Sequence, residues 1–178
     1  MPFPERLETE RLVLRRWRED DAADFAAIWA DPTVWAALMP GRPADPGFAD
    51  ERFRNHLAHW EAHGFGLWAV EERAGGRVAG WVGPSHPDFA PGLAREVEVG
   101  WSLREPFRGR GLATEGARAA VAASFEHLGR EEVISLIAPA NAPSIAVAER
   151  LAMRERGRVE TPGTGIELRI YRLARRRM

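Results

Sequence analysis

The sequence predicts a single α/β domain over residues 1–178, built on a mixed sheet with helices on both faces. Two observations support this fold class. Strand-like and helix-like patterns follow one another in the order β-α-α-β-β-β-α-β-α-β-β, with no linker or internal repeat between them. A glycine-rich turn joins an alternating strand to a long apolar-periodic helix, and a continuous apolar strand follows, which indicates a right-handed crossover between strands.

The N-terminal part of the chain is predicted as one strand and two helices. Alternating residues at 11–17 indicate the strand, and acidic residues at 19–21 begin the first helix. Three prolines and two glycines make 40–47 a loop, and a second helix is expected over 50–63. The apolar face of the first helix comprises Phe25, Ile28 and Trp29.

The middle of the chain is predicted as a hairpin followed by a third strand of the sheet. Segments 66–70 and 77–82 flank the turn Ala74-Gly75-Gly76, which is a strong hairpin signal. Residues 83–92 contain three prolines and are expected to form a loop. The alternating segment 96–103 then predicts the next strand.

The C-terminal part is predicted as two helices alternating with strands. The first helix follows the glycine-rich turn and ends at Gly129. The apolar run 133–137 has the length and composition of a buried strand. A last helix over 141–153 precedes two terminal strands, the second at 166–173.

Composition restricts the possible functions. The net charge of −1 does not support binding to nucleic acid or to a membrane surface. The absence of cysteine excludes disulfides, thiolate nucleophiles and cysteine-ligated metals. No signal-like segment and no apolar run long enough to cross a bilayer are found, so we expect a cytoplasmic protein.

Residues 108–114, Arg-Gly-Arg-Gly-Leu-Ala-Thr, predict a phosphate-binding turn at the start of a helix. Free backbone N–H groups and the helix dipole favour an anion there. Gly109 and Gly111 let the backbone approach the anion closely. Arg108 and Arg110 can add charge-assisted hydrogen bonds.

Two common phosphate loops do not fit this turn. A Walker A loop requires a lysine, and the chain contains none. A dinucleotide-binding Gly-x-Gly-x-x-Gly follows the first strand, whereas here the pattern comes after three earlier strands and ends in Thr114.

Segment 106–115 resembles the Arg/Gln-x-x-Gly-x-Gly/Ala pyrophosphate loop of GNAT N-acetyltransferases. The preceding 98–103 is similar to the fourth strand of that family, and Asn141-Ala142-Pro143-Ser144 with Glu149-Arg150-Leu151 resembles its Asn-x-x-Ser…Glu-Lys-Leu helix. Residues 9–15 and the hairpin within 64–81 are similar to the RimJ/RimL branch, the ribosomal-protein N-terminal acetyltransferases.

The resemblance implies a GNAT-like, mostly antiparallel sheet of about seven strands. In this fold the fourth strand is bulged and splays from the fifth, so that the pantetheine of acetyl-coenzyme A lies between them. It also implies that the whole chain is one acetyl-coenzyme A-binding domain that needs no metal. The residues it assigns to the cosubstrate are Trp101, Ser102 and Leu103 for pantetheine, Arg108, Gly109, Arg110, Gly111, Leu112, Ala113 and Thr114 for pyrophosphate, and Asn141 and Arg150.

The resemblance leaves the proton-transferring residues open. Many relatives have a tyrosine seven residues after the asparagine, where this chain has Ala148, and the sole tyrosine, Tyr171, is expected to be structural. Ser144 is the replacement acid, and the alternative is that its hydroxyl satisfies the helix start. Glu98 matches the carboxylate of the family strand and is a general base, or else an orienting group in a polar network.

Several further residues have two interpretations. Relatives read Leu-Gly-Phe where this chain has Leu151-Ala152-Met153, so a left-handed Ala152 would cost about 1 kcal/mol.

The spacing of His56, His59 and His63 places them on one helix face, which we interpret as solvated rather than metal-binding. Trp81 is among several tryptophans that either line an acceptor pocket or pack in the core.

The predicted function is acetyl transfer from acetyl-coenzyme A to a primary amine. The branch resemblance favours a protein N-terminal α-amine, and amino acids, polyamines and antibiotics are the small-molecule alternatives. The loops 40–47 and 83–92 are expected to select the acceptor. Because Ala148 replaces the usual tyrosine, the rival hypothesis is a coenzyme A-binding module that has lost catalysis. Similar proteins also suggest a homodimer.

Overall fold

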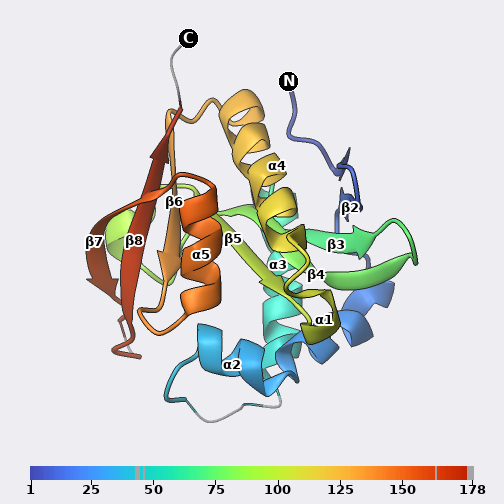
Figure 1. Cartoon of the computed structure of the whole chain (residues 1–178), viewed down its shortest axis with the longest axis horizontal. Helices are drawn as coiled ribbons and strands as arrows, with labels where there is room; N and C mark the ends of the chain where they lie inside the picture. The colour runs from blue at the N-terminus through green and yellow to red at the C-terminus, as the bar shows by residue number, and fades with distance from the viewer. Residues whose placement is uncertain (43–44, 46, 163, 176–178) are drawn as a thin grey trace.

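The computed structural model describes residues 1–42, 45, 47–162 and 164–175. In that part of the chain it has eight strands and five α-helices (Figure 1). The strands are β1 (Arg6–Glu8), β2 (Leu12–Arg15), β3 (Trp68–Glu72), β4 (Arg77–Ser85), β5 (Glu98–Leu103), β6 (Glu132–Ile137), β7 (Arg154–Glu160) and β8 (Glu167–Ala174). The helices are α1 (Ala22–Trp29), α2 (Pro32–Leu38), α3 (Phe48–His63), α4 (Leu112–His127) and α5 (Ala142–Arg150).

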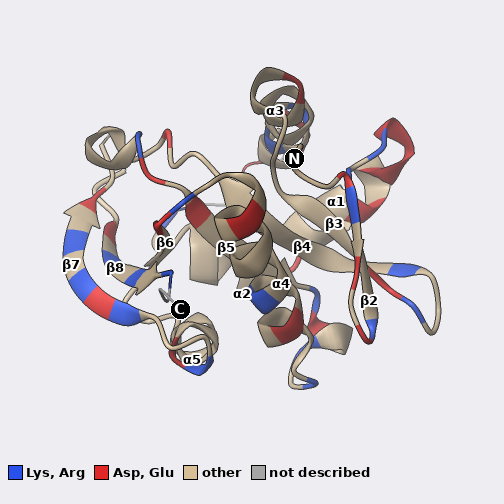
Figure 2. Cartoon of the chain, turned by 90° about the horizontal axis from the view of Figure 1, so that it is seen from above, with Lys and Arg blue, Asp and Glu red and all other residues tan. Residues whose placement is uncertain are grey.

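All eight strands form one sheet in the order β1-β2-β3-β4-β5-β6-β8-β7. Every neighbouring pair is antiparallel except β5 and β6, which α4 connects as a parallel pair. The prediction of a mixed, mostly antiparallel sheet is confirmed, with eight strands in place of about seven. Helices α1 and α3 lie on one face of the sheet and α4 and α5 on the other (Figure 2), which confirms the predicted layers.

Buried residues form one cluster on each side of the sheet. The larger cluster joins α4 and α5 to the central strands, and includes Leu112, Val99 and Ala148. The smaller packs α1 and α3 against β3 and β4 around Phe25, Phe53 and Trp81. The two clusters hold the ends of β5 and the starts of α4 and α5 in fixed positions, and those are the segments predicted to carry the site.

Strands β5 and β6 separate almost as soon as they meet. Their register contains a single pair, Glu98 with Ile134, and the N–H of Ile134 donates to the carbonyl of Val97 at 2.9 Å. On its other side β5 pairs with β4 over six residues without a register shift. The predicted splay is therefore present. The bulge that was expected in this strand is not seen in its pairing with β4, because the divergence of β6 alone opens the gap.

Two elements were not predicted from the sequence. Strand β1 has three residues, too few for a periodic pattern. Helix α2 begins at a clear signal that the prediction overlooked: Asp31 caps it by accepting a hydrogen bond from the N–H of Thr33 at 2.8 Å, and Pro32 occupies the first turn. The helix fills part of the segment between α1 and the 40–47 loop, of which residues 43, 44 and 46 lie outside the described residues.

The loop predicted over 83–92 begins later than expected. Gly83, Pro84 and Ser85 continue β4 and pair with β5, although glycine and proline usually interrupt strands. Gly83 is required by close packing, because a Cβ there would lie 2.8 Å from the carbonyl oxygen of Gly66. Tertiary contact thus overrides the local turn signal.

The end of α5 has the strained geometry that the sequence predicted. Ala152 has a φ of 63°, the only positive φ among the described non-glycine residues. The N–H of Met153 donates to the carbonyl of Ala148 at 3.0 Å, and that of Ala152 donates to Glu149 at 2.9 Å, so the turn closes the helix as a left-handed cap does.

Candidate active site

A cavity of about 1130 Å³ runs along the gap between β5 and β6. Its walls come from five segments that are distant in sequence: residues 10–11, α2 with Pro40, the end of β5, residues 107–118, and residues 138–150. Nearly all residues predicted to bind the cosubstrate line it, including Trp101, Gly111, Asn141 and Arg150. The fold therefore brings the predicted binding residues together.

The turn before α4 presents a row of unused backbone donors. Within the described chain, the N–H groups of residues 109–114 have no hydrogen-bond acceptor, and the helical bonds begin with Glu115 donating to Gly111 at 3.0 Å. Gly109 and Gly111 have φ of 71° and 79°, a left-handed backbone that glycine adopts without strain. This geometry fits the pyrophosphate of coenzyme A.

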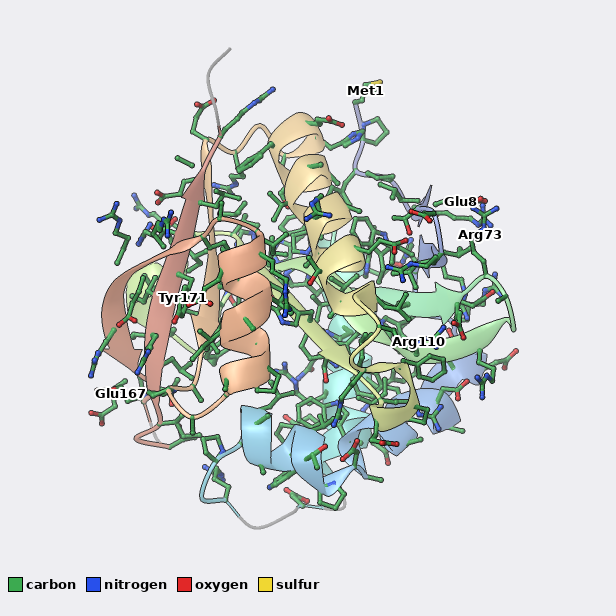
Figure 3. The ribbon with its side chains drawn as sticks, in the orientation of Figure 1. Met1, Glu8, Arg73, Arg110, Glu167 and Tyr171 are labelled. Atoms are coloured by element: carbon green, nitrogen blue, oxygen red, sulfur yellow. The ribbon has the colours of Figure 1, made fainter. Side chains whose placement is uncertain are left out.

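The side chains of the two arginines in the turn have other partners. Arg108 donates to the carbonyl of Leu103 at 2.7 Å and forms an ion pair with Asp31 at 2.8 Å, so it joins α2 to the end of β5. Arg110 pairs with Glu72 on β3 and lies beside the β3–β4 hairpin (Figure 3). Both guanidinium groups thus have acidic partners in this structure. The Arg108 N–H donates to the Glu105 carbonyl at 3.1 Å, whereas the Arg110 N–H has no acceptor in the described chain.

Positive charge at the cavity comes from other arginines. Arg118 and Arg150 line it, are exposed, and have no ion-pair partner among the residues described. Arg150 was predicted, whereas Arg118 was missed although its position four residues after Thr114 places it on the same helix face. Arg11 is a third, and it also neutralises Glu115 in the first turn of α4, where an unpaired carboxylate would repel a phosphate.

The main chain of β5 offers its free groups at Trp101. The carbonyls of Val97 and Val99 both face β6, where they accept from Ile134 N–H and from the Ser135 hydroxyl at 2.6 Å. Alternation along a strand therefore points the main chain of Trp101 into the gap and that of Ser102 toward β4. Of the three residues predicted to pair with pantetheine, Trp101 is the best placed, since the Leu103 carbonyl already accepts from Arg108.

Asn141 and Ser144 occupy the start of α5 beside the cavity. The side-chain oxygen of Asn141 caps the helix by accepting from the Ser144 N–H at 3.2 Å, which leaves its amide nitrogen for a ligand. The Ser144 hydroxyl has no hydrogen-bond partner in the described chain and lines the cavity. Ala148, one turn further on, is fully buried, and its methyl side chain cannot donate a proton.

Glu98 lies at the closed end of the gap between the strands. Its Oε1 accepts a hydrogen bond from the N–H of Leu136 at 3.3 Å, directly beyond the last paired residues of β5 and β6. Burial raises the pKa of Glu98 to about 7, against the opposing effects of the Leu136 N–H and the charge of Arg52. A carboxylate with this pKa is half ionised near neutrality, which suits a general base.

Other residues that the sequence singled out have structural roles or unexpected surroundings. Tyr171 on β8 is buried in the larger core (Figure 3). The prediction of a solvated histidine face is wrong for His56, which is 8% exposed, and for His59, whose Nδ1 bonds the Phe65 carbonyl. The described residues contain no group of histidine and carboxylate side chains arranged to hold a metal. None of the described helices has the length and apolarity needed to span a membrane.

The chain was compared with known proteins. A sequence model described as the acetyltransferase (GNAT) domain, Acetyltransf_3, matches residues 11–154. A structure of an acetyltransferase from Agrobacterium tumefaciens has a TM-score of 0.81 and is 30% identical, over 96% of this chain and 94% of that one. The FsC-acetyl coenzyme A-N(2)-transacetylase of Aspergillus fumigatus is 32% identical over 90% of this chain and 72% of its own length.

A ribosomal-protein acetyltransferase shares the fold of this chain. RimL, a ribosomal L7/L12 α-N-protein acetyltransferase whose structure contains coenzyme A, has a TM-score of 0.73 and covers 98% of both chains. Its sequence is 16% identical, which at this level shows a shared fold.

Proposed function

The chain belongs to the GNAT acetyltransferase family and is an acetyl-coenzyme A-dependent N-acetyltransferase, and on that premise we propose that the acceptor amine attacks the thioester directly, with Glu98 as base and Ser144 as acid. The observation that carries this proposal is that unused amides at residues 109–114 and the Ser144 side chain line one cavity. Glu98 lies outside that lining, at the point where β5 and β6 separate.

Binding and orientation are assigned to the backbone. The amides of 109–114 hold the pyrophosphate, and Arg118 and Arg150 add positive charge. The main chain of Trp101 and the amide nitrogen of Asn141 orient the pantetheine arm. When bound, acetyl-coenzyme A supplies an acetyl group activated as a thioester. A strand N–H facing the gap near Trp101 stabilises the developing negative charge on the carbonyl oxygen, a contribution of roughly 3–4 kcal/mol for one such donor.

Proton transfer is assigned to two side chains. Glu98 takes the proton that the attacking ammonium must lose, because its carboxylate is ionised above a pH of about 7. As the new C–N bond forms and the C–S bond breaks, the Ser144 hydroxyl gives a proton to the departing sulfur. The amine nitrogen loses its second proton to solvent, Ser144 regains a proton from solvent, and Glu98 releases the proton that it took. The overall reaction of an ammonium with the thioester thus yields an amide, a free thiol and one proton.

The acceptor class follows less directly from the fold. The resemblance to the RimJ/RimL branch supports an N-terminal α-amine, and the name of the Aspergillus fumigatus relative gives a transfer to an N(2) nitrogen. Incubation with acetyl-coenzyme A and a panel of peptides, amino acids, polyamines and aminoglycosides, followed by assay of free thiol, tests the proposal. Release of thiol with at least one amine is expected. Tight binding of the cosubstrate without release on any amine would refute catalysis.

Direct attack also has a clear signature in this chain. Because the sequence contains no lysine, its only primary amine is at the N-terminus, and any other acetyl retained by the protein would be an ester on a hydroxyl. We expect the intact mass of the protein to stay unchanged after incubation with acetyl-coenzyme A alone. An acetyl ester on Ser144 would instead indicate a covalent intermediate.

A further inference from the structure

Arg52 occupies an unusual position on the inner side of α3. Its Nε atom is shielded from solvent and has no hydrogen-bond partner, and Arg52 forms no ion pair with any residue that the structure describes. The guanidinium carbon lies 6.0 Å from the centre of the Phe48 ring. The side chain as a whole is partly exposed, so a ligand can reach it. An arginine Nε that is shielded from water and has no partner in the described chain can be satisfied by an oxygen of a ligand.

Two more polar groups beside Arg52 also lack partners. His56 follows one turn later on α3, is 8% exposed, and its Nε2 is unpaired in the described chain. Trp81 on β4 is 6% exposed, its ring centre is 6.4 Å from that of His56, and its Nε1 is also unpaired. A buried polar atom left without a hydrogen bond costs about 1–3 kcal/mol. A ligand oxygen would satisfy the N–H groups of Arg52 and Trp81, and that of His56 in the tautomer with its proton on Nε2.

Glu98 places this site next to the reaction. The charges of Arg52 and Glu98 influence each other, although no oxygen of Glu98 comes within the 4.0 Å of an ion pair. Glu98, Gly100 and Ser102 share the face of β5 that is opposite to the buried Val99 and Trp101. The Trp81 ring covers Gly100, where a Cβ would lie 3.2 Å from it. The Trp81 ring therefore covers the face of β5 that carries Glu98, and it lies beside His56 on α3.

We propose that Arg52 binds the carboxylate of the acceptor, so that the substrate is a small zwitterion whose amine is held at Glu98, such as an amino acid. The inference rests on the proposed function and specifies its acceptor. A guanidinium and a carboxylate that form no ion pair with each other complement the carboxylate and the ammonium of one molecule. The substrate takes the place of an internal ion pair.

Charge balance selects a carboxylate among the possible anions. A phosphate would carry up to two negative charges next to Glu98, which disfavours it by like-charge repulsion. A polyamine would place a second positive charge against Arg52, which is unfavourable for the same reason. A carboxylate brings a single charge, and its two oxygens match the fork of the guanidinium.

The test compares acceptors that differ only in the carboxylate. Rates of thiol release are measured for α-, β- and γ-amino acids and for their carboxamides, in the wild type, Arg52→Met and Arg54→Met. Arg54 is the matched control because it is exposed on the same helix. We expect kcat/KM to favour the best carboxylate over its carboxamide about tenfold or more in the wild type and in Arg54→Met. We expect that preference to disappear in Arg52→Met. Because the charge of Arg52 also lowers the pKa of Glu98, the two acceptors are compared within each variant at one pH well above 7.

Amino acids and their carboxamides differ in the basicity of the amine, and this difference affects every variant equally. Comparing the carboxylate-to-carboxamide preference between variants therefore removes its effect. A preference that persists in Arg52→Met, or a phosphorylated amine that outperforms every carboxylate, would overturn the proposal. Should Arg52→Met fail to fold, propionate is tested as an inhibitor of the wild type against propionamide at equal ionic strength. Competition with the amine by propionate alone supports the proposal, and equal inhibition refutes it. Thiol release with peptides but not with amino acids would refute only this inference, whereas no release with any amine would refute the proposed function.

Discussion

The carboxylate of Glu98 accepts a hydrogen bond from the backbone N–H of Leu136 at 3.3 Å, across the place where β5 and β6 separate. The backbone pairing of the two strands ends at Glu98 and Ile134, and this side-chain bond takes its place at Leu136. It explains how Glu98 can have two roles, since one oxygen orients the strands and the other remains available to take a proton. The two interpretations made from the sequence, base and orienting group, are thus compatible in one geometry.

Replacing Glu98 with glutamine is expected to change how the rate depends on pH. Below a pH of about 7 the carboxylate is protonated and cannot accept a proton, so kcat/KM of the wild type should fall about tenfold per pH unit. In Glu98→Gln the amine must arrive neutral, and the profile should follow the pKa of the acceptor instead. The rate should also fall by roughly 10²–10⁴. Steady-state kinetics from pH 5.5 to 9 measure both effects, and an unchanged profile would show that water is the base.

The same substitution is expected to stabilise the fold at high pH. Burial raises the folded-state pKa of Glu98 from an ordinary 4.5 to about 7, so the folded state binds more protons than the unfolded state between these values. Wild-type stability should therefore decrease as pH rises through this window, by an amount on the order of 3 kcal/mol. Glutamine keeps the acceptor for Leu136 N–H without this loss.

Urea unfolding at pH 5, 6, 7 and 8 measures that difference. We expect the advantage of Glu98→Gln over the wild type to grow with pH. Glu126→Gln is the control, because it makes the same substitution at an exposed position on α4. A constant advantage for Glu98→Gln would show that its pKa is ordinary.

Adding a methyl group to Gly111 is expected to weaken cosubstrate binding specifically. Gly111 and Gly129 flank α4, have φ of 79° and 61°, and each would be strained by about 1 kcal/mol as alanine. Gly111→Ala should lose stability and also bind coenzyme A at least tenfold more weakly, because the backbone amides of residues 109–114 are displaced. Gly129→Ala should lose stability alone. Calorimetric titration and thermal unfolding separate the two, and equal affinities would refute the pyrophosphate assignment.

The phosphate-binding turn at residues 108–114 could be predicted from the sequence because all of its parts are close together in the chain. Its amides and glycines lie within a few residues, and the start of a helix dictates where they point. The partners of Arg108 could not be found in this way, since Thr33 and Asp31 are 75 and 77 residues away and belong to a helix that was not predicted. Once α2 is known, the ion pair explains why Arg108 holds the end of β5.

The surroundings of Glu98 were hidden for a related reason. Alternation predicts that Glu98 faces away from the buried side of β5, which is correct, but it does not say that α3 covers that face. Arg52 and His56 were part of a helix whose hydrophobic pattern is weak, so their burial depends on tertiary packing. The burial of the polar residues on the inner side of α3 therefore could not be predicted from the sequence alone.

Replacing Ser144 with alanine is expected to slow turnover while leaving coenzyme A affinity nearly unchanged. The cap between Asn141 and the Ser144 N–H does not involve the hydroxyl, so the helix start should be preserved. If the hydroxyl protonates the departing sulfur, kcat should fall roughly 10- to 100-fold. With a thioester whose leaving thiol is more acidic, Ser144→Ala should lower kcat less, because that thiolate can leave without being protonated. An equal effect on both thioesters, or none, would assign the proton to water.

Replacing Ala152 with glycine is expected to stabilise the protein. Ala152 has a φ of 63°, which costs an alanine about 1 kcal/mol relative to glycine, and its side chain is exposed, so few contacts are lost. The greater freedom of glycine in the unfolded chain offsets part of the gain, and we expect a net increase of several tenths to about 1 kcal/mol. Gly129→Ala should shift stability in the opposite direction by a similar amount. If Ala152→Gly instead lowers the unfolding free energy, the left-handed turn is not the source of strain, and the cap after α5 would have to be held by the buried Met153.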